Sequence, residues 1–402
     1  MTVLVDVVNF NADASCMSAA KWLDILKGGP LSLMYRWLGL YVRLRKKMVI
    51  GFTGATVADL ATINPDSIAL VNSHPEIFQV IWRPFAHDVG LLRTSRGFTE
   101  NATLGWEVIK REFPHAQKYF LPPEFMITNE QVGCLCRNGT RGIFIYPQRF
   151  SVEIQRRIPK APYKVKGLLG CKLTCYPFDS EATEVYLDAI HRYETSRWNQ
   201  ILIDAAASLF FCWRDGESSF LVPNGIEREE FWLSGETQTI ERKFLTEIED
   251  SVTENCGNTE NDRYLSYPVH SFSAWMQELR MLGFIKRAQQ IEERLDALTT
   301  REKAIWLQVI NSDILSAVEK QPPQIKMRLE PDSHLLFECT LQRSERGFEG
   351  EEFLYLLEMV EKESQARKYL EHAQAPHMIK LRGRMQYLDR LEPRNDGVKA
   401  NG

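Results

Sequence analysis

Residues 2–10 read TVLVDVVNF, a run of mainly apolar and β-branched residues. Such a run is typical of a strand buried on both faces, as in a parallel sheet or a barrel. Comparable runs follow at 48–52 (MVIGF), 67–73 (SIALVNS), 118–122 (KYFLP), 142–147 (GIFIYP) and 209–213 (LFFCW). Helical patterns lie between several of these runs, and the alternation predicts parallel βαβ units in an α/β protein.

Helix signals accompany two of the predicted strands. The segment after Pro75 begins with Glu76 and repeats apolar residues at helical spacing, which favours a helix there. Thr128 stands where it can cap a second helix, with Gln131 at the capping-box position. We therefore expect helices after the predicted strands 67–73 and 118–122.

The character of the sequence changes near residue 250. Residues 250–266 (DSVTENCGNTENDRYLS) are polar and rich in asparagine, which is typical of a loop or linker. Helical patterns follow over 270–320, with charged neighbours four residues apart around Ile291–Arg301. The sequence predicts a catalytic domain over 1–249 and a mainly helical region over 250–402 that packs on it.

Composition narrows the class of protein. The chain has 402 residues, 44% of them hydrophobic and 25% charged, and a formal net charge of −4. This balance supplies a core without the basic surplus of nucleic-acid-binding proteins. Residues 31–42 are apolar but too short, and interrupted by Arg36, to span a bilayer. With no targeting signal at the amino terminus, we expect a cytoplasmic enzyme without nucleic-acid or membrane partners; its oligomeric state is left open.

Candidate site residues follow from the rule that functional groups gather at the carboxyl ends of parallel strands. Applied to the predicted strands, the rule selects residues that directly follow them, together with two side chains of the same region. They are Asn11 and Asp13, His74 and Glu76, Glu124, Asp215 and Glu217, with His87 in the helical region after His74 and Trp213 beside Asp215. Trp213 offers an aromatic platform on which the apolar face of a sugar can stack.

Three segments resemble the motifs of glycoside hydrolase family 57. They are NFNAD at 9–13, SHPEI at 73–77 continuing to PFAHDVGLL at 84–92, and FLPPEF at 120–125. The resemblance covers roughly residues 1–150. It implies a distorted seven-stranded β/α barrel, (β/α)7, with a mainly helical C-terminal region, and hydrolysis or transfer of α-glucosidic bonds with retention. The family's catalytic nucleophile is a Glu in the third motif, which corresponds to Glu124.

One departure from the family pattern concerns the first motif. The family carries a His-Gln-Pro triplet there, whereas this chain has Asn11-Ala12-Asp13, so the histidine that helps to hold a sugar hydroxyl is absent. Asn11 can still donate a hydrogen bond, but a different substrate preference is expected. The family's second catalytic carboxylate is an Asp, for which Asp215 is the best candidate because it ends an apolar strand, with Glu217 beside it.

The residues around Glu124 support the same role by a separate argument. A retaining glycosidase needs two carboxyl groups about 5–5.5 Å apart, one to attack the anomeric carbon and one to act as acid and base. Pro122 and Pro123 stiffen the turn that precedes Glu124. The structural alternative is a glutamate in the first turn of a helix, where it interacts favourably with the helix dipole. In the catalytic reading Asn11, Glu76 and His87 position substrate hydroxyls, and no cofactor is needed.

Two other functions stay open at the level of sequence. Asp13, His74 and His87 form a possible ligand set for one divalent metal such as zinc, which would suit a deacetylase or amide hydrolase acting on an amino sugar. Polysaccharide deacetylases are also distorted seven-stranded barrels, but their second motif spaces its histidines one helical turn apart, whereas His74 and His87 are thirteen residues apart. The third possibility is a non-catalytic barrel that binds a saccharide, which the missing histidine would permit.

Overall fold

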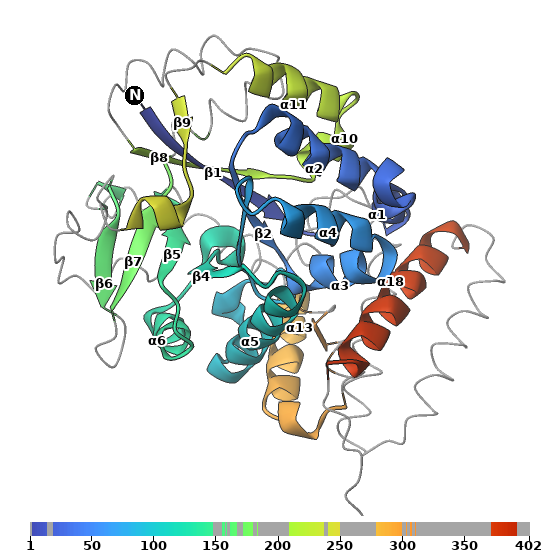
Figure 1. Ribbon diagram of the computed structural model, residues 1–402. Helices are drawn as coiled ribbons and strands as arrows, with labels where there is room; N and C mark the ends of the chain where they lie inside the picture. Colours follow the sequence, from blue (N-terminus) through green and yellow to red (C-terminus); the bar gives the residue numbers. More distant parts are fainter. Residues whose placement is uncertain are drawn as a thin grey trace, which may run out of the picture.

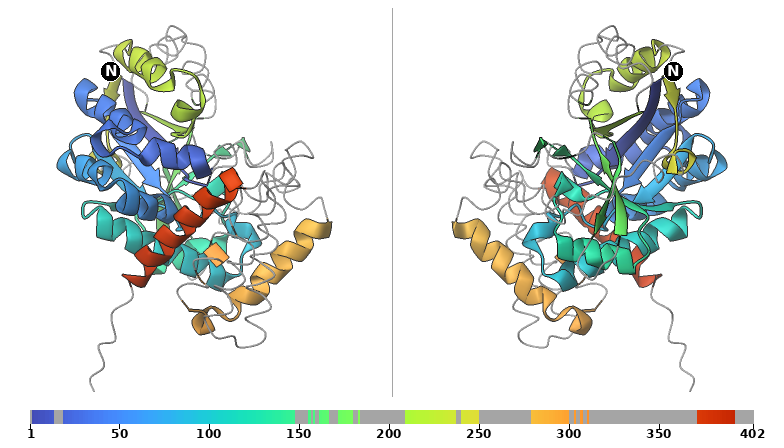
Figure 2. Two further views of the ribbon diagram at one scale, coloured as in Figure 1. Left: turned by 90° about the vertical axis from the view of Figure 1, so that its right-hand side faces the viewer. Right: turned by 90° about the vertical axis from the view of Figure 1, so that its left-hand side faces the viewer.

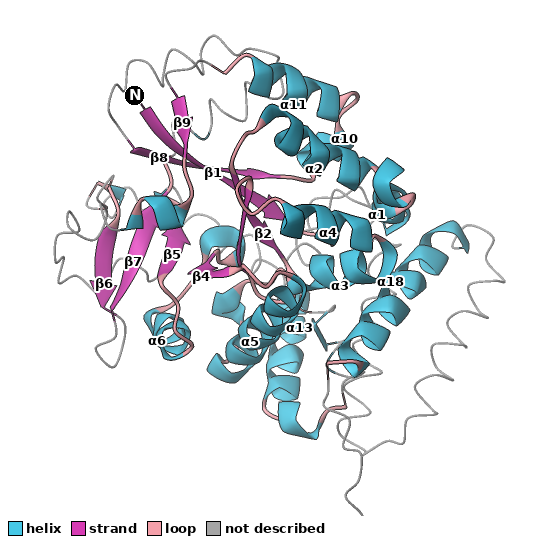
Figure 3. Cartoon of the chain, viewed as in Figure 1, coloured by secondary structure: helices cyan, strands magenta, loops and turns pink. Residues whose placement is uncertain are grey.

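The structure is a computed structural model, in which helices surround a strongly twisted sheet (Figures 1 and 3). The residues that it describes are 2–13, 19–147, 155–156, 158, 161–166, 172–179, 183, 209–236, 240–249, 279–299, 303, 306–307, 310 and 371–391. None of the described helices is long and apolar enough to cross a membrane.

The sheet consists of nine described strands. These are β1 (Thr2–Phe10), β2 (Met48–Phe52), β3 (Phe78–Trp82), β4 (Gln117–Phe120), β5 (Gly142–Ile145), β6 (Tyr163–Lys166), β7 (Lys172–Pro177), β8 (Leu209–Asp215) and β9 (Ile240–Arg242). Their order is β6-β7-β5-β4-β3-β2-β1-β8, with β9 paired to β1. From β7 to β8 the seven neighbouring strands run parallel, and β6 is antiparallel to β7. The predicted strands at 2–10, 48–52, 118–122, 142–147 and 209–213 are confirmed.

The two ends of this parallel array curl toward each other. One backbone hydrogen bond of 2.9 Å, from Asp179 N just beyond β7 to Phe211 O in β8, spans the gap where no strand ladder is present among the described residues. The rings of Tyr176 and Phe211 also meet across it, with centroids 5.5 Å apart. The chain is therefore an α/β protein with a distorted β/α barrel, as the sequence predicts.

The interior of the barrel is filled by side chains that alternate along the strands with those facing the helices. This inner core is apolar and rich in aromatic rings, and comprises Val5, Val7, Val49, Ile81, Tyr119, Leu121, Phe125, Phe144, Tyr146, Tyr176, Phe178, Phe211, Phe244, Leu245 and Ile248. Because successive side chains of a strand point to opposite faces, Asn9 continues the inward row of Val5 and Val7. That row ends with polar groups at the carboxyl end of the barrel.

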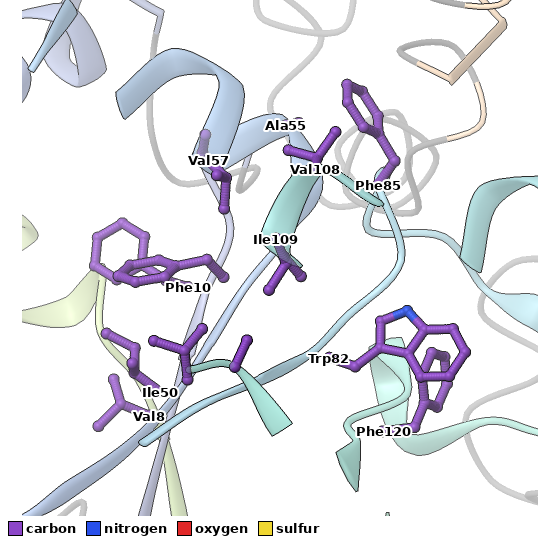
Figure 4. Close-up of a cluster of buried hydrophobic side chains, with 14 of the residues drawn as sticks. Val8, Phe10, Ile50, Ala55, Val57, Trp82, Phe85, Val108, Ile109 and Phe120 are labelled. Atoms are coloured by element: carbon purple, nitrogen blue, oxygen red, sulfur yellow. The ribbon is translucent and has the colours of Figure 1, made fainter. Parts of the chain in front are cut away.

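A second, larger core lies between the strands and the outer helices. Figure 4 shows Val8 and Phe10 of β1 and Ile50 of β2 facing side chains of the helices that follow the strands. The outer helices are α1 (Ala19–Leu26), α2 (Leu33–Leu44), α3 (Gly54–Ile63), α4 (Pro65–Ser73), α5 (Ser95–Glu112), α6 (Asn129–Arg137), α10 (Ser218–Leu221) and α11 (Gly225–Ser234). Fully buried aromatic side chains such as Trp37 and Trp82 contribute about 2–3 kcal/mol each by leaving water.

Local signals explain where several helices begin. The side chains of Ser32, Thr53 and Thr94 each accept a hydrogen bond from a backbone N–H in the first turn of α2, α3 and α5. Thr128 caps α6 and forms the full capping box with Gln131, as predicted.

The predicted strand at 67–73 is wrong. Asn64 caps a helix whose first residue is Pro65, so the run SIALVNS forms most of α4. The segment after Pro75, predicted to be helical, instead supplies the buried strand β3. A short apolar run fits a buried strand and a buried helix equally well, and the Asn-Pro pair ahead of it favours the helix.

Two described helices come from the C-terminal region, α13 (Leu279–Glu292) and α18 (Glu371–Asp389). Figure 2 shows α18 lying along the outer helices and α13 reaching outward from them. α18 packs on α1 and α3, and α13 packs on α5. The predicted loop at 250–266 lies outside the described residues. The division of the chain at residue 250 therefore stays a prediction.

Glu292 of α13 inserts its carboxylate at the start of α5. It accepts hydrogen bonds of 2.8 Å from the Thr94 backbone N–H, the Thr94 hydroxyl and Arg93 Nη1. Arg93 also lies 3.2 Å from Asp88, and all of these charged side chains are buried. Burial raises the pKa of the Asp88 carboxyl to about 7, with Glu292 adding to the rise and Arg93 opposing it.

We expect Asp88→Asn to change the pH dependence of stability. The unfolded chain ionises Asp88 near pH 4 but the folded chain near pH 7, so Asp88 lowers stability progressively as the pH rises through this window. The variant lacks this loss, and its free energy of unfolding relative to wild type should rise from pH 5 to pH 8. Urea unfolding across that range measures the difference. Asp24→Asn, at an exposed position of α1, is the control; equal slopes for all three proteins would contradict the prediction.

Candidate active site

The carboxyl end of β1 binds the carboxyl end of β8 through alternate residues. Asn9 lies opposite Asp215 in the strand register, and Asn9 Nδ2 donates a 2.8 Å hydrogen bond to Asp215 Oδ1. The Gly216 N–H donates to the Asn9 carbonyl at 2.7 Å. Two residues further on, the backbone N–H of Asn11 donates to Glu217 Oε1. The structure thus brings Asn11, Asp215 and Glu217 together, with Asn9 beside them.

Gly216 is required for this close approach. A Cβ at this position would lie 2.5 Å from the Phe10 ring, which real structures do not tolerate. Because Gly216 has no side chain, the turn can pack on Phe10 while Asp215 and Glu217 on either side of it contact the end of β1. Asp215 is partly exposed, whereas Glu217 is only 2% exposed.

Glu124 stands on a strained turn at the end of β4. After Pro122 and Pro123, Glu124 has φ 52° and Phe125 has φ 55°, both in the left-handed region. Each such residue costs roughly 1–2 kcal/mol when it is not glycine. Strain of this kind persists where the surroundings impose it, and it is common at functional sites. The short 3-10 turn η3 (Pro123–Phe125) is thus not the first turn of a long helix, which was the structural alternative for Glu124.

Contacts of Phe125 fix the position of this turn. The Phe125 ring packs edge-on against Trp213 of β8 with centroids 5.0 Å apart, and against Tyr146 at 5.6 Å. Glu124 is therefore held next to the end of the strand that carries Asp215. Trp213 is partly exposed, and among the described residues its indole Nε1 has no hydrogen-bond partner.

His87 lies beside Glu124. Its Nε2 is 3.6 Å from Glu124 Oε1, and the Glu124 side chain is 20% exposed. Burial lowers the pKa of His87 well below its ordinary value, and the positive charge of Arg83 lowers it further, against a smaller opposing effect of Asp13. His87 is therefore a neutral imidazole at neutral pH, suited to hydrogen bonding rather than to ion pairing with Glu124.

Arg83 is a component of the site that sequence reasoning missed. It follows β3 directly, is buried, and lies against Gly51, where a Cβ would be 2.9 Å from Arg83 Cδ. Its charge acts on the pKa of both His87 and Glu217. The signal that could have found Arg83 is its place after the apolar run FQVIW at 78–82, which was predicted to be helical.

Asp13 is bound by basic side chains of the C-terminal helix α18. Its carboxylate pairs with Lys380 at 2.6 Å and with Arg384 at 2.7 Å, and Lys380 also donates to the Ala12 carbonyl at 2.9 Å. Burial alone would raise the pKa of Asp13, but Arg384 and Lys380 outweigh it and hold the pKa far below its usual range. Asp13 is thus a permanently charged anchor of the segment that follows β1 (residues 11–13, the β1 loop).

His74 and Glu76 lie at the opposite end of the barrel from Glu124. His74 caps the end of α4 ahead of the first residue of β3, so both side chains are at the amino ends of the strands. They are hydrogen-bonded to each other at 3.0 Å, with His74 partly exposed and Glu76 exposed. The expectation that they contact a substrate beside Glu124 was tied to the wrong strand. The predicted metal set of Asp13, His74 and His87 is not assembled, and the described residues contain no other cluster of three such side chains suited to a metal.

The sequence and the structure were compared with those of known proteins. No protein-family model and no curated protein sequence match the chain. A GH57-type branching enzyme from Pyrococcus horikoshii is similar in structure, with a TM-score of 0.66 and 11% identity over 90% of this chain and 94% of that one. The chain shares the fold of the GH57 enzymes.

Two further solved structures with the GH57-like fold are an α-amylase, AmyC, from Thermotoga maritima and a 4-alpha-glucanotransferase from Thermococcus litoralis. The first has a TM-score of 0.57 and 8% identity over 93% of this chain and 96% of that one. The second has a TM-score of 0.62 and 13% identity over 84% of this chain, which spans 59% of the glucanotransferase. At these identities the similarity establishes the fold, and the expected family 57 fold is confirmed.

Proposed function

We propose that the chain is a carbohydrate-active enzyme that cleaves or transfers α-linked glycosidic bonds with retention, using Glu124 and Asp215. The observation that carries the proposal is the contact of Phe125 with Trp213, because it holds the Glu124 turn against the end of the strand that bears Asp215. Two carboxyl groups at one end of a barrel are what a retaining glycosidase requires. The α-glucan-acting enzymes named above share this fold and support the substrate class.

The two proposed roles rest on the exposure of the carboxyl groups. In the first step the Glu124 carboxylate attacks the anomeric carbon, while the second acid gives its proton to the departing glycosidic oxygen. In the second step that group removes a proton from water, or from a sugar hydroxyl, which displaces Glu124 from the anomeric carbon. The second acid must reach both the leaving oxygen and the incoming acceptor. Asp215 is partly exposed and Glu217 is buried, so Asp215 is the better acid and base.

Neighbouring side chains have supporting roles in this proposal. Neutral His87 can hydrogen-bond a substrate hydroxyl next to Glu124, and Trp213 provides an aromatic surface for a sugar ring. The Asn11 side chain is buried and its Oδ1 accepts from the Asp13 N–H at 3.1 Å, so it shapes the β1 loop. Water as acceptor would give hydrolysis and a saccharide would give transfer.

The test is an assay of the purified protein on a panel of α-linked glucans, with released reducing ends and redistributed chain lengths as readouts. We expect Asp215→Asn to lower turnover by roughly 10²–10⁴-fold, the usual contribution of general acid–base catalysis. Added azide, which needs no general base, should partly restore turnover of a substrate with a good leaving group and give a glycosyl azide of retained configuration. Asp24→Asn is the matched control. Wild-type activity in Asp215→Asn would refute the assignment.

A further inference from the structure

Glu217 is a second carboxyl group beside Asp215 that the proposed reaction does not use. Alternate residues at the end of β1 hold the two acids, Asn9 in the strand through its side chain and Asn11 just after it through its backbone N–H. The Gly216 N–H bonded to the Asn9 carbonyl fixes the turn between them. Both carboxyl groups are thus fixed by one strand end and cannot move far apart.

The surroundings of Glu217 disfavour a second negative charge. Its Oε1 accepts from Asn11, while its Oε2 is buried and has no hydrogen-bond partner among the described residues. Burial, and next the charge of Asp215, raise the pKa of Glu217 well above its ordinary value; the Asn11 N–H, the N–H of Glu217 itself and Arg83 oppose the rise. Glu124 and neutral His87 also lie at this end of the barrel, and so does charged Asp13, which is paired with Lys380 and Arg384.

We propose that Asp215 and Glu217 share one proton in the working enzyme, and that Glu217 is a positioning residue that keeps this proton available to Asp215 at higher pH. The inference rests on the proposed function and deepens it. Two carboxyl groups held together cannot both ionise freely, so the first to lose its proton makes the second hold its own more tightly. The pair would then set the upper pH limit for general acid catalysis.

Charge is conserved through the proposed reaction with this arrangement. Before reaction Glu124 carries one negative charge and the pair carries one. When Glu124 becomes a neutral glycosyl ester, Asp215 has passed its proton to the leaving oxygen, and the pair carries both charges. The acceptor's proton then returns to Asp215 as Glu124 is released. Arg83, buried in the same region, faces an unchanged total charge at each stage.

The experiment compares wild type with Glu217→Gln, which keeps an oxygen for the Asn11 N–H but cannot ionise. We expect the alkaline limb of the kcat/KM profile to move to lower pH by at least about half a pH unit, because Asp215 loses the like charge that retains its proton. Turnover at the optimum should stay within about tenfold of wild type. An unmoved limb would overturn the proposal, and so would a loss of 100-fold or more, since Glu217 would then itself be the acid and base.

A readout that does not depend on activity separates failure of this inference from failure of the proposed function. Carboxyl-carbon NMR of protein labelled at Asp and Glu should show one high-pH transition for the pair in wild type. The transition of the remaining acid should move to lower pH in both Glu217→Gln and Asp215→Asn. Glu227→Gln, on the exposed face of α11, should leave it unchanged. Coupled titration without turnover of any glucan would contradict the proposed function but support the shared proton. Independent transitions of the two acids would contradict the shared proton alone.

Discussion

Glu124→Gln is expected to lower turnover of an α-glucan by at least about 1,000-fold, because an amide cannot attack the anomeric carbon. The substitution keeps the size and shape of the side chain and the left-handed backbone at this position. Folding and binding should therefore change little, and the apparent affinity for an oligosaccharide should stay within about threefold. Rapid-quench assays give turnover, and calorimetric titration gives the affinity.

Chemical rescue makes this test specific for a nucleophile. Glu124→Gly removes the carboxylate at a position whose φ of 52° suits glycine, so the turn should be kept. With azide in place of the missing carboxylate, an activated α-glycoside should give a glycosyl azide of inverted configuration, opposite to that from Asp215→Asn. Glu227→Gln is the control for general effects of removing a glutamate. Turnover by Glu124→Gln near the wild-type rate would remove Glu124 from the mechanism.

The barrel was predictable because its strands are buried on both faces. β1 and β2 are mainly apolar runs, and nearly every residue in them is buried. The same reasoning failed at 67–73, where only the central run IALV is continuously apolar and the Asn64-Pro65 cap decided the outcome. One misplaced strand had two consequences at once: it put His74 in the site, and it hid Arg83, which follows the true strand β3.

Long-range contacts set the other limit of sequence reasoning. Asp13 looked like a candidate ligand because it follows β1, but its partners Lys380 and Arg384 lie more than 360 residues away. The sequence around Asp13 contains no signal for these two partners. Likewise, Glu217 and Asp215 have nearly the same place in the sequence, and only the burial of Glu217 distinguishes their proposed roles. The sequence predicted that both acids follow the strand at 209–213, whereas their burial and their different access to solvent could be seen only in the packed structure.

Arg384→Met is expected to destabilise the protein by about 3–5 kcal/mol, the usual cost of removing one partner from a buried ion pair. Arg384 bonds both oxygens of Asp13, at 2.7 and 2.9 Å, and both oxygens of Asp59, at 2.8 and 2.7 Å. Its removal leaves two carboxylates whose remaining side-chain partners, within the part of the chain that the structure describes, are Lys380 and the Trp22 indole. Urea unfolding at pH 7 measures the loss. Arg390→Met, at an exposed position near the end of α18, is the matched control.

A double variant tests whether the loss comes from the unpaired charge. Asp59→Asn combined with Arg384→Met removes one of the stranded carboxylates, so part of the lost stability should return, whereas losses that simply add would contradict the pairing. The effect should also reach the site, since Asp13 belongs to the loop whose Asn11 N–H binds Glu217. We therefore expect Arg384→Met to alter the pH profile of turnover in the same direction as Glu217→Gln. Arg384→Lys should rescue little of either property, because an ammonium cannot hold two carboxylates with the planar fork of a guanidinium.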